Sequence, residues 1–160
     1  MTPDKIIIRK ARKNDVEDIS KLIINNIKKV KENKYTKEQK DSWVSFNSPE
    51  HQLRRLKDSD RDIFILEKDS KIIVVGGITK KGEIKTLYAD YKKRGSGYGT
   101  RMFNFLEGYA RKHKLKKLSL TATPSAVDFY SSNGFKIIKE ENVFYNGLYF
   151  LETEMEKKLK

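Results

Sequence analysis

The sequence contains no cysteine in its 160 residues. This absence excludes disulfide bonds, thiolate nucleophiles and cysteine-ligated metals, and it is compatible with a reducing compartment. The sequence has only two histidines, His51 and His113, and neither has a partner at the spacing of metal ligands. Each is more typical of a solvated helix residue than of a metal ligand or a general base. We therefore expect no metal cofactor.

Long apolar runs are also missing. No stretch approaches the roughly 20 apolar residues that a membrane-spanning helix needs. The chain runs from Met1 into the isoleucines at 6–8 and then into charged residues, which is too short for the apolar region of a signal peptide. We expect a cytoplasmic protein without a membrane partner.

Positive charge is in clear excess. The 35 Lys and Arg residues outnumber the 22 Asp and Glu residues and give a formal net charge of +13. Such a charge concentrates polyanions, including nucleotide cofactors and nucleic acids. The lysines are spread along the chain and mixed with acidic residues, so a lysine-rich composition explains them as well as a binding surface does.

The length suits one domain, which we place at residues 1–160.

Hydrophobic periodicity and turn residues predict an α/β protein with a mixed sheet of about seven strands and four or so helices. Strands are expected at residues 6–10, 63–66, 72–75, 83–89, 117–122, 135–143 and 148–155. Helices are expected from Asn14, with Glu17 as its capping partner, from Thr36, from Ser48, after the glycine turn at 95–99, and at 125–133. Hairpin turns are expected at 69–70 and 146–147, and a bulge or close backbone approach at 76–77.

Residues 83–111 combine a strand, a basic glycine-rich turn and an amphipathic helix, and they carry the strongest functional signal. Free N–H groups in the first turn of the helix and the positive end of its dipole would bind phosphate oxygens, with Arg94 as a bidentate cation. We predict a pyrophosphate ligand. The sequence lacks the Gly-Lys-Ser/Thr of a Walker loop, since Thr100 and Arg101 follow Gly99, and the spacing is not that of a Rossmann fingerprint.

Two short motifs, one at Arg94, Gly97 and Gly99 and one at residues 126–135, resemble segments of the GCN5-related N-acetyltransferase (GNAT) family. Arg94, Gly97 and Gly99 match Arg/Gln-x-x-Gly-x-Gly/Ala, the acetyl-CoA pyrophosphate signature of that family. About thirty residues later, 126–135 is similar to the family's Ala-x-x-Phe-Tyr-x-x-x-Gly-Phe segment. The order and separation of the two motifs make the resemblance specific, and it extends in weaker form over nearly the whole chain. It implies a single GNAT-like domain whose fourth and fifth strands splay apart, with the pantetheine of acetyl-CoA in the wedge.

The resemblance also implies functional residues. Tyr130 occupies the position of the acid that protonates the leaving thiolate, and backbone N–H groups at 87–89 would polarise the thioester carbonyl. The sequence departs from the family at Asp90, where many members have proline, and at 121–124, where many carry an asparagine. The cofactor-binding residues that we predict are Leu87, Tyr88, Ala89, Arg94, Gly95, Ser96, Gly97, Tyr98, Gly99, Thr100, Ser125 and Tyr130.

Glu83 is the predicted general base. It lies eleven residues before Arg94 (94 − 83 = 11), the offset at which histone acetyltransferase-like members carry a glutamate. Strand alternation would place Glu83, Lys85, Leu87 and Ala89 on one face. The alternatives are an exposed carboxylate paired with a lysine, and proton transfer through water or from an amine that is already neutral.

The acceptor is expected to be the primary amine of a small molecule or a peptide. Tyr35, Gln39 and Trp43 are similar to a Tyr-x-x-x-Gln-x-x-x-Trp segment that lies over the acceptor site in some small-molecule members, although aromatic residues at this spacing are equally typical of a core. Carboxylates could line an acceptor pocket or pair with lysines in solvent. The carboxylates in question are Glu38, Glu140, Glu141 and Glu152.

Two other functions remain open at this stage. The charge and the tyrosines near 88–98 would suit a nucleic-acid-binding module, but no recognition-helix, RNP or zinc pattern accompanies them, so we do not expect nucleic acid. The chain could also be an acetyl-CoA sensor without catalysis. The late strands from Phe135 onward offer edges through which two copies could form a homodimer.

Overall fold

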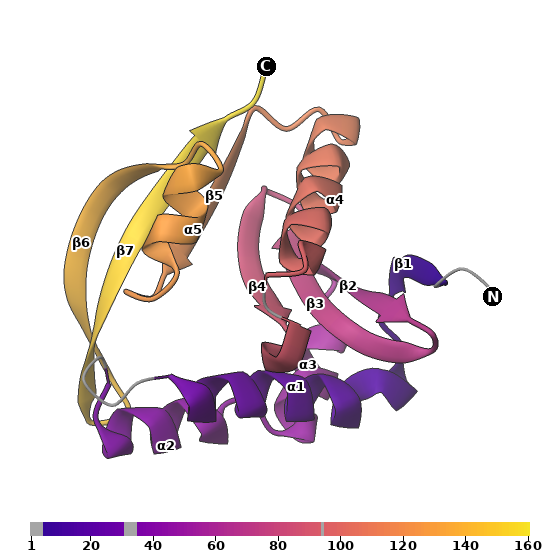
Figure 1. The fold of residues 1–160 in the computed structure, drawn as a ribbon. Coiled ribbons are helices and arrows are strands. Elements are labelled where there is room, and N and C mark those ends of the chain that lie inside the picture. Colours follow the sequence, from indigo (N-terminus) through magenta and orange to yellow (C-terminus); the bar gives the residue numbers. More distant parts are fainter. Residues whose placement is uncertain (1–4, 31–34, 94) are drawn as a thin grey trace.

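In the computed structural model, which describes residues 5–30, 35–93 and 95–160, seven strands form one mixed sheet (Figure 1). The strand order is β1-β2-β3-β4-β5-β7-β6. The strands are β1 (Ile6–Lys10), β2 (Arg61–Lys68), β3 (Lys71–Thr79), β4 (Glu83–Ala89), β5 (Lys117–Ala122), β6 (Lys136–Tyr145) and β7 (Leu148–Lys158). The α-helices are α1 (Val16–Lys29), α2 (Lys37–Ser45), α3 (Pro49–Lys57), α4 (Tyr98–Lys112) and α5 (Val127–Ser132). Single 3-10 turns lie at Lys13–Asp15 and Tyr91–Lys93.

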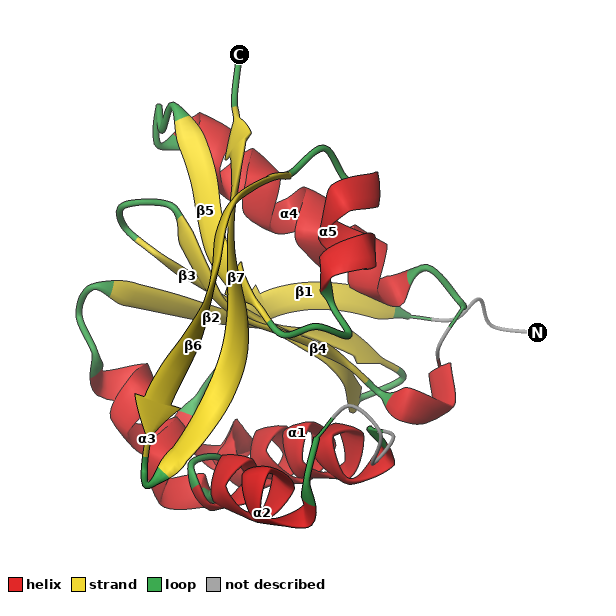
Figure 2. Ribbon diagram, turned by 90° about the vertical axis from the view of Figure 1, so that its left-hand side faces the viewer, coloured by secondary structure: helices red, strands yellow, loops and turns green. Residues whose placement is uncertain are grey.

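The helices cover both faces of the sheet (Figure 2). On one face, α4 and α5 pack in a core that contains Met102, Phe103 and Leu106, each at most 1% exposed. On the other face, α1 contributes Ile23 and Ile27 to a second core beneath β2 and β3. The apolar stripes read from the sequence are therefore the stripes that are buried, as expected for amphipathic helices that flank a sheet.

Short turn signals in the sequence predicted several local conformations, and the structure confirms them. Asn146 and Gly147 have φ of 53° and 78°, so β6 and β7 form the predicted hairpin. Gly76 meets α4 so closely that a Cβ there would lie 2.7 Å from Met102 Cγ. This contact confirms the close approach predicted at 76–77, whereas the β3–β4 register shift after Gly77 has its extra residue on β4.

The predicted start of the first helix at Asn14 is wrong. The chain forms a 3-10 turn at Lys13–Asp15 first, and α1 begins at Val16. The carboxylate of Asp15 accepts hydrogen bonds from the Arg12 backbone N–H (2.7 Å) and from Arg9 Nη1 and Nη2 (2.8 and 3.0 Å). This ion pair with β1, which the local sequence does not reveal, fixes the entry to the helix in place of a cap at Asn14.

Asp15→Asn is expected to lower the free energy of unfolding by about 2 kcal/mol at pH 7, because a buried bidentate partner of Arg9 loses its charge. The Arg9 hydrogen bonds hold the pKa of Asp15 below its ordinary value. The stabilisation is therefore present above the unfolded pKa of about 4 and is lost as the pH falls through the folded pKa. Urea unfolding of both proteins at pH 7 and pH 3 checks this. An equal difference at both pH values would contradict it.

The other boundary differences are small. The helix predicted at 125–133 is shorter, because residues 124–126 form a turn and α5 spans only Val127–Ser132. Its predicted end is confirmed, since Gly134 has a φ of 93°. The last hairpin is longer than predicted on both strands, ending β6 at Tyr145 and β7 at Lys158.

Candidate active site

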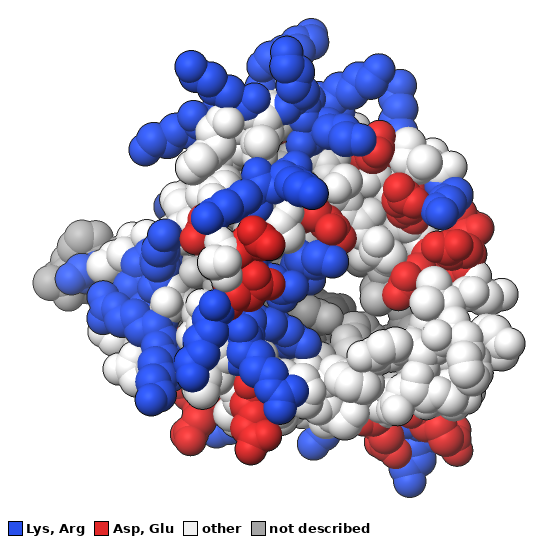
Figure 3. All heavy atoms as spheres, turned by 180° about the vertical axis from the view of Figure 1, so that it is seen from behind, with Lys and Arg blue, Asp and Glu red and all other residues white. Residues whose placement is uncertain are grey.

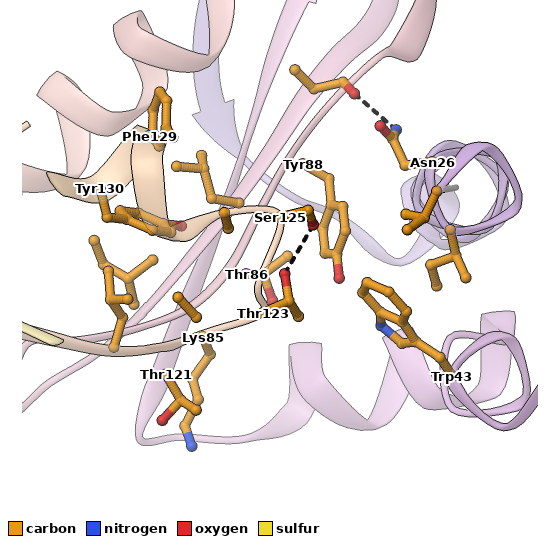
Figure 4. Close-up of a pocket in the computed structure, with 18 residues that line it drawn as sticks. Asn26, Trp43, Lys85, Thr86, Tyr88, Thr121, Thr123, Ser125, Phe129 and Tyr130 are labelled. Carbon is orange, nitrogen blue, oxygen red and sulfur yellow. Dashed lines mark hydrogen bonds between the residues drawn. The ribbon is translucent and has the colours of Figure 1, made fainter. Parts of the chain in front are cut away.

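A cleft opens between β4 and β5. These two strands run parallel, but they pair only at Glu83 with Ser119 and at Ile84 with Leu120. Beyond these residues the strands diverge, as the splayed fold predicted, and a cavity of about 390 Å³ lies between them. Side chains of α1, α2 and α5 close the cleft around the two strands (Figure 4).

The backbone of β4 presents polar groups to this cleft. Asp90 N–H donates to Ile73 O in β3 at 2.6 Å. In an antiparallel strand, the N–H and C=O groups of successive residues point alternately to one side of the strand and to the other. The main-chain groups of Tyr88 therefore point toward β3, and those of Leu87 and Ala89 point toward the cleft. Two of the three predicted backbone positions, Leu87 and Ala89, therefore direct their main-chain groups toward the gap.

Asn26 on α1 fixes the open end of β4. Its Nδ2 donates to Ala89 O at 2.8 Å (Figure 4) and also to Leu22 O at 2.9 Å, and the residue is buried. The role of Asn26 was not predicted from the sequence. The only available signal was a polar residue next to the apolar stripe of the first helix, and that signal does not name its distant partner on β4.

The glycine-rich turn lies next to the cleft. Gly95 and Gly97 both have φ of 80°, a left-handed conformation that favours glycine. Gly97 O accepts the first intrahelical hydrogen bond of α4 from Arg101 N–H at 3.0 Å, so the N–H groups at 98–100 have no intrahelical acceptor. A Cβ on Gly99 would lie 3.9 Å from Ala89 Cβ, which places the start of α4 against the open end of β4.

Three further predicted cofactor residues have a definite setting. Ser96 N–H donates to Lys93 O at 3.3 Å within the turn. Tyr98 carries Lys68 Nζ 5.6 Å from its ring centre. Arg94, the predicted bidentate cation, lies outside the described residues, whereas Lys92 and Lys93 beside it are exposed in the 3-10 turn after β4. The N-terminus of α4 therefore lies in a positive field, which favours an anionic ligand.

Tyr130 enters the cleft from α5. The side chain packs against Phe129 and Phe135, with ring centres 5.2 and 5.5 Å apart, and the residue is only 8% exposed. Its hydroxyl points toward the middle of the cleft (Figure 4). Burial raises the pKa of Tyr130 above its ordinary value, so the hydroxyl keeps its proton through neutral pH. The group is available as a proton donor.

Ser125 and Thr123 also line the cleft, from the segment between β5 and α5. Both follow β5, and their side-chain oxygens lie 3.3 Å apart (Figure 4). Ser125 belongs to the turn before α5 and not to a helix, contrary to the predicted start at 125. It nevertheless lines the cleft, as a predicted cofactor-binding residue should.

A bulge interrupts β4 near its start. Gly77 of β3 pairs with Thr86 of β4, and the next residue of β3, Ile78, pairs with Ile84. One extra residue of β4 therefore lies between these two pairs. Ile84 therefore packs in the same core as Leu87, on the side of α4. The predicted alternation, with residues 83, 85, 87 and 89 on one face, is wrong for this reason.

The bulge determines where Glu83 lies. Glu83 sits on the opposite face from Ile84 and pairs through Oε2 with Lys85 Nζ at 2.9 Å. Its backbone N–H donates to Thr79 Oγ1 at 3.0 Å. In the described part of the chain Glu83 does not line the cleft, while Lys85 does. The contact with Lys85 is the alternative that the sequence left open, and a role as base stays a prediction.

A second cavity, of about 580 Å³, adjoins the first on the side of α2 and α3. Tyr35 and Trp43 both line it, with ring centres 5.4 Å apart, and Trp43 also lines the first cavity. Trp43 lies beside the Tyr88 ring (Figure 4), and burial raises the pKa of Tyr88 to about 12. Two of the three predicted substrate residues thus come together at the junction of the cavities.

Gln39 has a different setting. It completes the predicted capping box, since Thr36 N–H donates to Gln39 Oε1 at 2.9 Å and Gln39 N–H donates to Thr36 Oγ1 at 3.1 Å. Its Nε2 donates to Tyr149 O, which ties α2 to β7. Among the described residues it lines neither cavity, so the contact with substrate predicted for Gln39 remains untested and its visible role is structural.

Residues distant in sequence complete the second cavity. Arg55 and Arg61 come from α3 and the start of β2, and Glu152 comes from β7. Burial raises the pKa of Glu152, and neighbouring Glu141 adds to this effect. Of these residues, the sequence analysis considered only Glu152 and Glu141, because no local motif connects an arginine on a short helix with the far hairpin.

The decisive observation is a match to a known protein family. The sequence model of the family described as "Acetyltransferase (GNAT) domain" matches residues 31–159. The chain belongs to the GNAT family. The splayed strands, the glycine turn before α4 and the Tyr130 segment thus occur in a confirmed member of the family that the sequence motifs resembled.

Solved structures show the same fold. A GCN5-related N-acetyltransferase from Rhodopseudomonas palustris is 21% identical, with 99% of each chain covered and a TM-score of 0.88. PaiA N-acetyltransferase from Thermoplasma acidophilum, solved in complex with coenzyme A, is 23% identical, with 97% of this chain and 99% of that chain covered and a TM-score of 0.79. A point mutant of SpeG spermidine N-acetyltransferase from Vibrio cholerae is 19% identical, with 96% of this chain and 93% of that chain covered and a TM-score of 0.67.

The family match identifies this GNAT protein as an acyltransferase. No match was found among curated proteins. In the residues that the structure describes, no helix is long and apolar enough to cross a membrane. The cytoplasmic location stays a prediction.

The β6–β7 hairpin exposes large apolar side chains. β6 is an edge strand of the sheet, and Ile138 and Phe144 on it are 51% and 62% exposed. Tyr149 on β7 is 63% exposed. These features suit the homodimer expected from the late strands, which stays a prediction that light scattering can test.

Proposed function

We propose that this GNAT protein transfers the acetyl group of acetyl-CoA to a primary amine of a small molecule or peptide by direct attack of the amine. The observation that carries the proposal is the juxtaposition of the cleft between β4 and β5 with the N-terminus of α4. One elongated ligand could then meet the backbone of both elements. The structure of PaiA in complex with coenzyme A, a protein of the same fold, supports this choice of co-substrate.

The residues present fit acetyl-CoA. The N–H groups of Tyr98, Gly99 and Thr100, which have no acceptor within α4, suit a pyrophosphate together with Lys92 and Lys93. The inward main-chain groups of β4 suit the amides of a pantetheine arm, in the way that a sheet edge accepts another strand. When bound, acetyl-CoA supplies an activated acetyl thioester.

The chain's own groups then have distinct tasks. Leu87 or Ala89 N–H polarises the thioester carbonyl as negative charge develops on its oxygen. Tyr130 Oη donates a proton to the sulfur that leaves, because its raised pKa keeps it protonated until that step. The amine must lose a proton. We keep Glu83, acting through water, as the proposed acceptor of that proton, and Glu152 is its competitor because it lines the adjoining cavity.

The first test is calorimetric titration with CoA and acetyl-CoA at two salt concentrations, followed by thiol release from acetyl-CoA across a panel of amines. We expect CoA binding at both salt concentrations and turnover of at least one amine. Binding without any turnover would favour a sensor. Absence of CoA binding, with nucleic-acid affinity that falls steeply as salt rises, would favour the nucleic-acid-binding alternative.

A further inference from the structure

The second cavity has charges of opposite sign on its two sides. Arg55 and Arg61 lie at the side formed by α3 and β2, while Glu152 lines the cavity from β7, near Tyr35 and Thr123. Lys85 also lines the cavity and is close enough to act on Glu152, but its Nζ pairs with Glu83 Oε2 at 2.9 Å. From behind, the surface is hollowed between a side rich in Lys and Arg and a side rich in Asp and Glu (Figure 3). A ligand that carried both charges would match this polarity.

Arg55 is fixed in place by neutral acceptors. Its Nη1 donates to Asn47 Oδ1 at 2.9 Å and to Gln52 Oε1 at 3.1 Å, and its Nη2 donates to Phe46 O at 2.6 Å. Of the five N–H donors of a guanidinium, Nε–H and one hydrogen of Nη2 remain. Nε and Nη2 lie on one edge of the guanidinium, so both can donate to the oxygens of a carboxylate. Among the described residues, no carboxylate pairs with Arg55.

Arg61 is also poorly compensated. Its Nε lies 3.7 Å from Asp58 Oδ2 and is buried without a hydrogen bond in the described part of the chain, and the side chain is 17% exposed. Burial lowers the pKa of Arg55, and the positive charge of Arg61 adds to this effect. Two neighbouring guanidinium groups at the wall of a cavity are unfavourable unless an anion offsets them.

We propose that the acceptor amine also carries a carboxylate, which binds at Arg55 and Arg61 while the amine points toward Thr123 and the cleft of Tyr130. This inference rests on the proposed function and specifies its acceptor. The partly buried Glu152, close to Tyr35 and Thr123, is placed to attract the ammonium end. A polyamine, the substrate class in the name of the SpeG neighbour, would instead place a second cation against the two arginines.

The test compares three amines of equal chain length: an ω-amino acid, the plain monoamine and the diamine. We expect kcat/KM for the amino acid to exceed that of the monoamine by about tenfold or more, with the diamine the poorest, since an ion pair with a partly buried guanidinium is charge-assisted. Arg61→Gln is expected to lower kcat/KM for the amino acid by about tenfold or more and to leave that of the monoamine within about threefold.

Arg54→Gln is the matched control, because Arg54 is exposed on the same helix as Arg55 and lines neither cavity. It removes the same charge and should preserve the preference for the amino acid. CoA titration of every variant separates the carboxylate inference from the proposed function. If the wild-type protein did not bind CoA, the proposed function itself would be removed. With CoA bound, equal use of the three amines, preference for the diamine, or turnover of none overturns the carboxylate inference.

Discussion

Arg94→Glu is expected to weaken CoA binding by at least about 100-fold, or roughly 3 kcal/mol. Arg94 is the first residue of the pyrophosphate signature, and the N–H groups that begin α4 follow it closely in the chain. A bidentate arginine contributes charge-assisted hydrogen bonds to phosphate, and the substitution replaces this attraction with repulsion. Calorimetric titration with CoA measures the change directly, without any need to know the acceptor.

Lys112→Glu is the matched control for Arg94→Glu. It makes the same change in net charge on an exposed residue at the far end of α4, about 20 Å from the first turn by the rise of a 15-residue helix. That separation exceeds the Debye length of about 8 Å at physiological salt, so CoA affinity should change by less than about threefold. Equal losses in the two variants would mean that the general positive field, and not the glycine turn, holds the ligand.

Local signals in the sequence predicted the fold well. The Asn146-Gly147 turn, the Thr36 cap and the apolar stripe of α4 each depend on residues within a few positions of one another, and the structure contains all three. The β4 bulge and the Asp15 ion pair were not predictable in this way. Each depends on a partner in another element. Asp15 contacts Arg9 on β1, and the bulge is defined by how β4 pairs with β3.

The same distinction applies to the candidate site. The glycine turn and the Tyr130 segment are contiguous motifs, so their residues were named before their geometry was known. The second cavity, where we propose that the acceptor binds, is assembled from α2, α3, β2, β4 and the last hairpin, and its two arginines have no sequence pattern of their own. The part of the chain that we propose selects the amine is therefore the part that required the structure.

Tyr130→Phe is expected to lower kcat by about 100-fold while leaving the affinity for CoA within about threefold. General acid catalysis typically contributes 10²–10⁴-fold to a rate. The substitution removes only the hydroxyl that points into the cleft and keeps the ring against Phe129 and Phe135. An effect on kcat and kcat/KM alike, with ligand affinity kept, is the signature of a group that acts in the transition state.

Tyr109→Phe supplies the control for Tyr130→Phe. Its hydroxyl donates to Asp62, outside both cavities, so removing it should cost about 1 kcal/mol of stability and leave kcat unchanged. The raised pKa of Tyr130 also sets the expected pH dependence, because its acid form persists at pH 10, where an ordinary tyrosine is about half ionised. Steady-state kinetics with acetyl-CoA and a turned-over amine, from pH 6 to pH 10, should show no loss of wild-type kcat on the alkaline side from this group.

An unchanged kcat in Tyr130→Phe would assign the proton on the leaving sulfur to water and leave Tyr130 with a packing role.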